Sequence, residues 1–422
     1  MTAAQRIPGA PTTPPATMSM PLPGGGVGER RIEALDGLRG AMTIAVVLSH
    51  YFGELPHGLS PFMFGWIAVN MFFVLSGYLI GTLILEKMDR SNFFAVFYVR
   101  RACRTFPAYF FCVIVVFLII FHFSARAWID VETWFPLWSY LSFTQNFFMV
   151  STESIGPHWL APTWTLALEE QFYLFAPALF VIVPRRWLLY VLAACAVSAV
   201  FVRALMLQTL TGQMALLVLL PSRADVLLAG VLLAVLMRTL TINWETHDRA
   251  IRLVPILALV IVGVIASLDR ARGTQFFIVL APFVTAIGSA AFICTLIRGA
   301  PEAHRFRSKV LRFFGSISYS TYLTHLAVLG LMHGFLLGTP PDLATAPQLL
   351  VTLAALPVAV LMGWALTKIV EEPITAYGRS WKWGEARAKQ PGNPRGMGGP
   401  RRYPSSPVEP GTYSSESRAE IT

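Results

Sequence analysis

The chain has 422 residues, of which 55% are hydrophobic and only 13% are charged, and its mean hydropathy is +0.59. This composition excludes an ordinary soluble domain and predicts an all-α polytopic membrane helix bundle. The net charge of +10 comes from Lys and Arg in short loops and in the C-terminal tail, so it predicts topology and no nucleic-acid partner. The four cysteines have no metal-like spacing, and we expect no metal.

The chain begins with a stretch rich in Pro, Gly and Thr that lacks the apolar run of a signal peptide. We expect residues 1–30 and the basic residues 379–422 to form disordered cytoplasmic tails around a transmembrane domain over 31–378. About ten transmembrane helices are predicted, at 38–52, 62–85, 105–123, 162–183, 187–206, 213–237, 253–268, 275–297, 313–335 and 348–370.

Loop charges orient this bundle. Ten spans put both termini on one side, and most Lys and Arg residues then fall in the loops of that side. The opposite loops carry only Arg126, Arg270 and Arg272. The positive-inside rule therefore predicts that both termini are cytoplasmic.

The first predicted helix carries Asp36 and Arg39 near its start and His50 near its end. Arg39 and His50 are eleven residues apart, so they lie on nearly the same face, about 16 Å from one another along the axis. The two side chains are therefore suited to bind the two ends of a long ligand. Alternatively, Arg39 snorkels at the cytoplasmic end and His50 bonds to another helix.

Two other polar groups are candidates for chemistry. Glu169 and Glu170 are adjacent, so at most one easily faces the centre, and we expect Glu169 to orient His50 while Glu170 bonds locally. Arg101 and Arg104, with Arg100, either retain the loop on the inner side or form a phosphate-binding patch together with the first helix.

Further polar residues have open interpretations. Arg223 and Asp225 are two apart in the sixth predicted span, so each needs a partner elsewhere in the bundle. His325, in the ninth span, is either a site residue or an interhelical hydrogen-bonding residue. The tryptophans of the outer loop 124–161 are interfacial anchors or platforms for sugar rings, and we favour anchors.

Four motifs resemble the acyltransferase-3 family of integral-membrane O-acyltransferases, and the resemblance covers residues 32–377. They are LDGLRG followed by His50; FFVLSGYLI with Ser76; RACRTFPAY, from Arg101 to Tyr109; and WTLALEEQFY, with Trp164, Glu169 and Tyr173. RADVLLAG with Arg223, SYSTYLTHL with His325 and the Glu371, Glu372, Pro373 triplet agree more weakly. Thr105 and Thr165 depart mildly from the pattern, and we expect no fused esterase-like domain.

The resemblance implies transfer of an acyl group, commonly acetyl, from cytoplasmic acyl-CoA to a hydroxyl of a carbohydrate, glycolipid or related acceptor. It implies a multi-pass protein of the bacterial inner membrane without a permanently bound cofactor. His50 is then the general base, helped by Glu169, or itself carries the acyl group. The coenzyme A phosphates are assigned to Arg39, Arg101 and Arg104. Substrate-binding or structural roles are assigned to Asp36, Ser76, Tyr109, Trp164, Tyr173, Arg223 and His325.

Two functions from other classes compete with the enzyme. A transporter of a polar solute could also have ten spans with buried Arg, Asp and His, although no internal repeat is visible in the sequence. A non-catalytic scaffold of envelope synthesis would tolerate the loss of Arg39 and His50.

Overall fold

A computed structural model describes residues 32–209, 212–239 and 244–386. These residues form helices and no β-strand, which confirms the predicted all-α class. The predicted tail 1–30 and residues 387–422 of the second tail lie outside the described residues, as do both termini.

Nine helices within the described ranges are long and apolar enough to cross a bilayer. They fall at nine of the ten predicted spans. Their cores are α2 (Gly65–Lys87), α3 (Phe93–His122), α6 (Thr163–Ile182), α7 (Arg185–Thr209), α9 (Leu220–Thr239), α10 (Trp244–Arg272), α11 (Phe276–Ile297), α14 (Ser318–Leu337) and α15 (Ala346–Leu366).

The remaining predicted span is α1 (Glu33–Leu48), which continues without a break into the π-helical turn η1 (Ser49–Gly53). Together these two elements are about 30 Å long, the thickness of the hydrocarbon core of a membrane. A π-helical turn widens the helix and often marks a functional site. Here it contains His50, the histidine that the sequence places at the end of the first span.

Some boundaries differ from the prediction. The span expected at 213–237 is divided at Leu219, whose backbone is extended, into α8 (Met214–Val218) and α9. Helix α3 begins twelve residues earlier than predicted, because an apolar criterion stops at its arginines although the helix continues past them. The last span continues through η4 (Thr367–Glu371) and α16 (Glu372–Ser380).

Short helices complete the fold and connect the spans. They are η2 (Ser60–Phe62), α4 (Leu137–Leu141), α5 (Gln145–Thr152), η3 (His158–Leu160), α12 (Ala303–Phe306) and α13 (Lys309–Ser316). The chain after α16 returns to the beginning of α3, where the Arg100 guanidinium donates a hydrogen bond of 2.8 Å to the Trp381 carbonyl.

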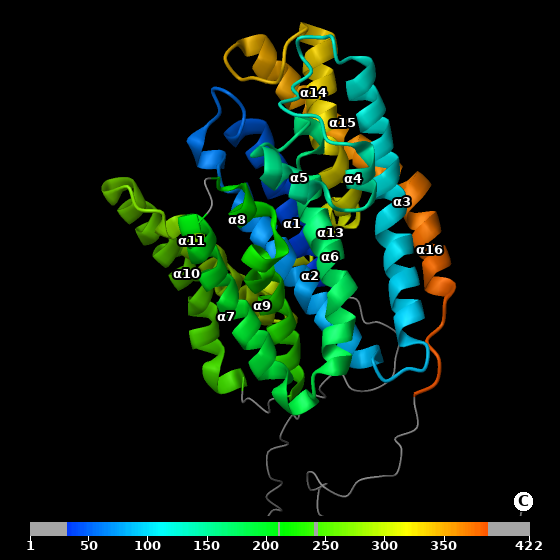
Figure 1. Cartoon of the computed structure of the whole chain (residues 1–422), viewed down its shortest axis with the longest axis vertical. Coiled ribbons are helices and arrows are strands. Elements are labelled where there is room, and N and C mark those ends of the chain that lie inside the picture. Colours follow the sequence, from blue (N-terminus) through cyan, green and yellow to red (C-terminus); the bar gives the residue numbers. More distant parts are fainter. Residues whose placement is uncertain (1–31, 210–211, 240–243, 387–422) are drawn as a thin grey trace, which may run out of the picture.

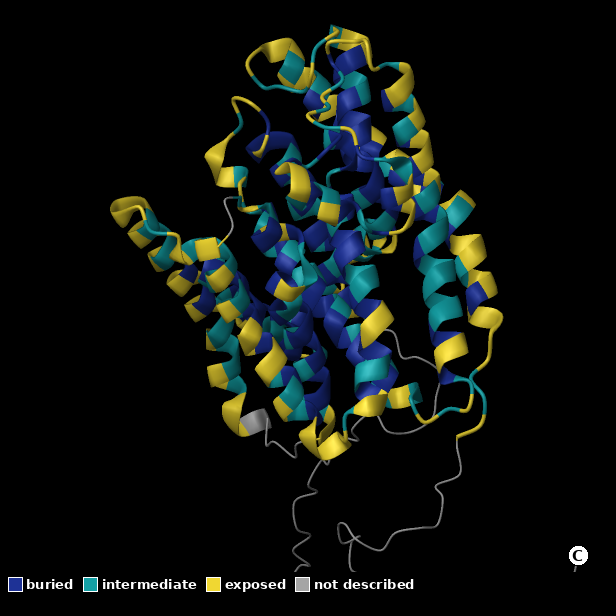
Figure 2. Ribbon diagram, viewed as in Figure 1, coloured by how far each residue is buried: buried dark blue, intermediate teal, exposed yellow. Residues whose placement is uncertain are grey.

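Helix α1 occupies the middle of the molecule (Figure 1). Helices α7, α9, α10 and α11 lie on one side of it, and α3, α14, α15 and α16 lie on the other. Buried residues concentrate where these groups meet, whereas the outward faces of the outer helices are exposed, as expected of surfaces that contact lipid (Figure 2). Both groups of helices therefore present side chains to the same interior.

Helices α2 and α9 cross with their backbones in close contact at two glycines. A Cβ atom added to Gly77 would lie 2.0 Å from the Leu227 carbonyl oxygen, and one added to Gly230 would lie 1.9 Å from the Val74 carbonyl oxygen. Both glycines belong to motifs that carry the family resemblance. These two motif positions thus serve helix packing, in the way small residues allow membrane helices to approach closely.

Candidate active site

His50 and His325 form a hydrogen-bonded pair between η1 and α14. The His50 Nδ1 atom lies 2.6 Å from His325 Nε2, and His325 Nδ1 lies 2.8 Å from the Tyr322 carbonyl oxygen. The Tyr51 hydroxyl donates a hydrogen bond of 2.8 Å to the His325 carbonyl, which fixes α14 against η1. His325 is fully buried, whereas 18% of the His50 side chain is exposed.

This chain of contacts determines the tautomers of the neutral pair. A carbonyl oxygen only accepts, so His325 Nδ1 carries a proton and donates it to Tyr322. Nε2 of His325 is then an acceptor, and His50 Nδ1 must donate to it. The remaining nitrogen, His50 Nε2, is left with a free lone pair.

His50 lines a cavity of about 630 Å³ that reaches from η1 to α9 and α11. The volume is within the usual range for a small-molecule site. Its polar lining includes Glu54, His158, Arg223 and Tyr322, and Trp164 forms part of its apolar wall. The cavity can therefore hold a polar ligand against the free nitrogen of His50.

Glu54 is the carboxylate nearest to His50. Its Oε2 atom lies 3.5 Å from His50 Nε2, and its Oε1 atom accepts a hydrogen bond of 3.0 Å from the Ser49 hydroxyl. We did not identify Glu54 from the sequence. The signal that could have found it is its position four residues after His50, which places two side chains side by side on a helix.

The predicted arginine cluster assembles around the beginning of α1. Arg39 lies 3.8 Å from Asp36, and 27% of its side chain is exposed. Arg101 and Arg104, on α3, are close enough for their positive charges to act on Arg39. Three guanidinium groups in one place can bind phosphates, and the carboxylates of Asp36, Glu169, Glu170 and Glu371 lie close enough to act on them.

Glu169 lies in this arginine cluster. The charges of Arg101 and Arg39 act on it, and it hydrogen-bonds to Ser76 and Tyr173, whose hydroxyls also bond to one another. The Arg101 guanidinium lies over the Tyr173 ring, 4.1 Å from its centre. The structure thus brings together Glu169, Ser76 and Tyr173, but it places Glu54, and not Glu169, in contact with His50.

Tyr322 lies within reach of charged residues from both groups. The Tyr322 hydroxyl bonds to the Thr165 hydroxyl at 3.0 Å and to the Pro162 carbonyl at 3.2 Å, and the ring lines the cavity. Both Glu169 and Glu54 act electrostatically on Tyr322. Among the described residues that line the cavity, none belongs to the arginine cluster. The structure therefore places the arginine cluster outside the His50 cavity, and Tyr322 is the cavity residue on which a carboxylate of the cluster acts.

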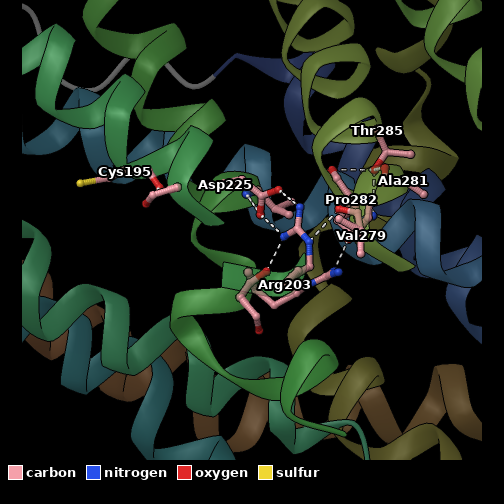
Figure 3. A network of polar contacts seen from close by, with 12 residues as sticks. Cys195, Arg203, Asp225, Val279, Ala281, Pro282 and Thr285 are labelled. Atoms are coloured by element: carbon pink, nitrogen blue, oxygen red, sulfur yellow. Dashed lines mark hydrogen bonds and ion pairs between the residues drawn. The ribbon is translucent and has the colours of Figure 1, made fainter. Parts of the chain in front are cut away.

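Other predicted residues lie elsewhere. The Tyr109 hydroxyl donates to the Tyr140 carbonyl at 2.9 Å, so Tyr109 anchors the outer segment containing α4 to α3. Arg223 bonds to Asn70 and Asp225 bonds to Arg203, which confirms that each has a partner on another helix (Figure 3 shows the second pair).

The tryptophans of the outer loop divide into two kinds. Trp128 and Trp159 are buried and stacked on one another, whereas Trp134 and Trp138 are exposed. None of the four lines the cavity, as far as the described residues extend. The structure therefore gives no support to a sugar platform at the His50 site.

The family model described as "Acyltransferase domain" matches residues 32–368, most of the chain. The chain belongs to this acyltransferase-3 family. Membership confirms the resemblance drawn from the motifs and disfavours the transporter. It covers the helices that carry both the arginine cluster and the His50 cavity.

Two O-acetyltransferases are similar to this chain. The peptidoglycan O-acetyltransferase OatA of Listeria monocytogenes is 28% identical over 74% of this chain and 51% of its own length. The O-acetyltransferase OatA of Staphylococcus aureus is 34% identical over 35% of this chain and 24% of its own length. The chain spans about half the length of the first relative and a smaller share of the second. No solved structure matches the chain with significance.

Proposed function

We propose that this acyltransferase-family protein moves an acetyl group from acetyl-CoA to a hydroxyl of a carbohydrate acceptor. Coenzyme A binds at the arginine cluster on the cytoplasmic side, and the acceptor binds in the His50 cavity. The observation that carries the proposal is the lone pair on His50 Nε2, which faces this cavity because His325 and Tyr322 fix the tautomer of the pair.

His50 acts as the general base of the reaction. Its Nε2 atom removes the proton from the acceptor hydroxyl while the hydroxyl oxygen attacks the thioester carbonyl. A new C–O bond forms, the C–S bond breaks, and the sulfur of coenzyme A takes the proton back from His50. Glu54, 3.5 Å away, stabilises the cation that exists on His50 between these steps.

The arginine cluster supplies donor binding. Arg39, Arg101 and Arg104 hold the phosphates of coenzyme A, and Glu169 orders this cluster through its contacts with Ser76 and Tyr173. The pantetheine arm then reaches His50 by passing Tyr322, which lines the cavity. No cofactor besides the acyl-CoA substrate is needed for this chemistry.

The relatives support a proposal for the acceptor class and the location. The Listeria relative is named for peptidoglycan, so we expect a glycan hydroxyl of the cell envelope as acceptor and the bacterial plasma membrane as location. In this proposal a donor from inside and a glycan from outside meet in one helix bundle.

Transfer of radiolabelled acetyl from acetyl-CoA tests the proposal. Membranes that contain the protein, supplied with a cell-wall glycan extract, should yield labelled glycan whose label mild alkali releases as acetate. His50→Ala should lower this labelling about 100-fold or more, the usual contribution of a general base. Full labelling by His50→Ala, or no labelling by the wild type, would overturn the assignment.

The same assay distinguishes a general base from an acetyl carrier at His50, and it also tests the non-catalytic scaffold. If His50 carries the acetyl group, the protein becomes labelled without acceptor, and hydroxylamine removes the label. A general base gives no such labelled protein. A scaffold predicts that Arg39→Ala and His50→Ala leave envelope acetylation unchanged.

A further inference from the structure

Arg203 and Arg223 are buried arginines on the neighbouring helices α7 and α9, but within the described ranges only Arg203 has a carboxylate partner. Arg203, on α7, is fully buried and donates to both oxygens of Asp225, at 3.0 and 2.6 Å, and to the Val279 carbonyl at 2.9 Å (Figure 3). The Val226 N–H also donates to Asp225. Asp225 therefore forms its ion pair with Arg203.

Arg223, on α9, has a neutral partner instead. One of its terminal nitrogens donates to the side-chain oxygen of Asn70 on α2, and Asn70 in turn donates a hydrogen bond of 2.9 Å to the Thr285 hydroxyl. Asp225 acts on Arg223 only at a distance. Among the described residues, no carboxylate forms an ion pair with Arg223, and its Nε atom is buried without a hydrogen-bond partner.

The other acidic groups of the cavity are held by their own neighbours. Asp269 accepts hydrogen bonds from Thr274 and from the N–H groups of Phe276 and Phe277. Glu54 is held by Ser49 beside His50. Arg223 thus presents to the cavity wall a guanidinium that has no ion-pair partner in the described part of the chain, although only 6% of the residue is exposed.

Burying a guanidinium without an ion-pair partner costs free energy, and a bound anion lowers this cost. Its unused N–H donors match the oxygens of a carboxylate or phosphate, which an arginine binds through two parallel hydrogen bonds. A neutral ligand would leave this charge unpaired.

We infer that Arg223 binds an anionic oxygen group, carboxylate or phosphate, of the acceptor that occupies the His50 cavity. The inference rests on the proposed function in assigning the cavity to the acceptor. His50, on one wall of the cavity, contacts the hydroxyl that is acylated. Arg223, on another wall, binds the anionic group of the same molecule. The protein therefore selects sugar acids or phosphorylated glycans over neutral ones.

Direct binding without acetyl-CoA tests this inference. The purified protein in lipid nanodiscs is titrated calorimetrically with glucuronate, with glucose 6-phosphate and with glucose. At least one anionic sugar should bind about tenfold or more tightly than glucose, as expected for a charge-assisted hydrogen-bonded pair. The stronger of the two identifies the group as carboxylate or phosphate.

Three variants locate the effect at Arg223. Arg223→Gln should abolish the preference for the anion, and Arg223→Lys should retain part of it. Asn70→Asp keeps the shape of the side chain but gives Arg223 a carboxylate of its own, so it should also abolish the preference while the protein stays folded. Arg126→Gln, which removes an exposed charge outside the cavity, is the control and should bind as the wild type does.

The outcomes are distinct from those of the acetyl-transfer assay. Equal binding of glucose and both anions, binding of neither anion, or an unchanged preference in Asn70→Asp overturns the inference. A preference for an anion that depends on Arg223, in a protein that transfers no acetyl group, supports the anion site and overturns the proposed function.

Discussion

The imidazole rings of His50 and His325 are nearly parallel, with an angle of 8° between them, and their facing nitrogens are 2.6 Å apart. The two histidines are 275 residues apart in the chain, and the contact joins the first membrane helix to the ninth predicted span. In the proposed mechanism this pair makes His325 a positioning residue for the general base, His50.

Removing His325 should slow catalysis without weakening donor binding. His325→Leu removes the acceptor that fixes His50, so we expect kcat to fall about 10- to 100-fold with little change in the KM for acetyl-CoA. His325→Gln, which can still accept a hydrogen bond, should restore part of the rate. The pH profile of kcat should change shape in the Leu variant, because either tautomer of His50 then becomes accessible.

The matched control is His333 on the same helix. It is equally buried and bonds to the Thr352 hydroxyl at 2.9 Å, and the described cavity lining does not contain it. His333→Leu should leave the pH profile intact. Equal kinetic effects of the two Leu variants would mean that His325 acts only through packing.

Arg101 should affect donor binding more than the chemical step. We expect Arg101→Gln to raise the KM for acetyl-CoA about tenfold, because one charge-assisted contact to a phosphate is lost, while kcat changes less. Added salt should weaken binding less in the variant than in the wild type. Arg100→Gln alters an arginine that bonds to the Trp381 carbonyl, so its KM should stay near that of the wild type. A loss confined to kcat would contradict the phosphate assignment.

Ionisation of Glu54 should determine how the rate rises with pH on the acidic side, or limb, of the pH profile. Partial burial raises the pKa of the Glu54 carboxyl above its ordinary value, and the hydrogen bond from Ser49 opposes that rise. Since the ionised form stabilises the His50 cation, the rate should increase with pH as Glu54 loses its proton. This increase should occur at a higher pH than for an exposed carboxyl group.

Two substitutions check the sign of this effect. Glu54→Gln should lower kcat about tenfold and remove the limb that Glu54 causes. Ser49→Ala removes the bond that lowers the pKa, so the limb should move to higher pH. A limb that moves to lower pH, or that persists unchanged in Glu54→Gln, would assign it to another group.

Gly77 is predicted to be essential for packing. Gly77→Ala places a Cβ atom 2.0 Å from the Leu227 carbonyl, and we expect a loss of about 1–3 kcal/mol in the free energy of unfolding, typical of overpacking. Thermal unfolding in detergent measures it. Gly263, on α10, has no atom within 4 Å of an added Cβ, so Gly263→Ala should unfold at the temperature of the wild type or slightly above it.

The sequence predicted the helices well because a membrane span is defined by its length and its apolar character, both of which are local properties. The errors occurred where a helix continues beyond the apolar part, as at Phe93, or where an apolar run is divided, as at Leu219. Charge and hydropathy do not report backbone continuity in either case.

The sequence predicts which residues belong to the site, but it does not predict which of them contact one another. His50 and His325 were both recognised as candidates, yet nothing local shows that helices so far apart in the chain bring their rings together. The carboxylate beside His50 is Glu54 and not the predicted Glu169, because the pattern of apolar helices carries no information about the loop that follows η1.

In the proposed mechanism Tyr322 lies between the donor and the acceptor, so two substrates that arrive from opposite faces of the membrane need not compete for one entrance. Both can be bound at once. Steady-state kinetics should therefore show a ternary complex, with intersecting rather than parallel reciprocal plots, and free coenzyme A should leave the acceptor's access from the far face unobstructed.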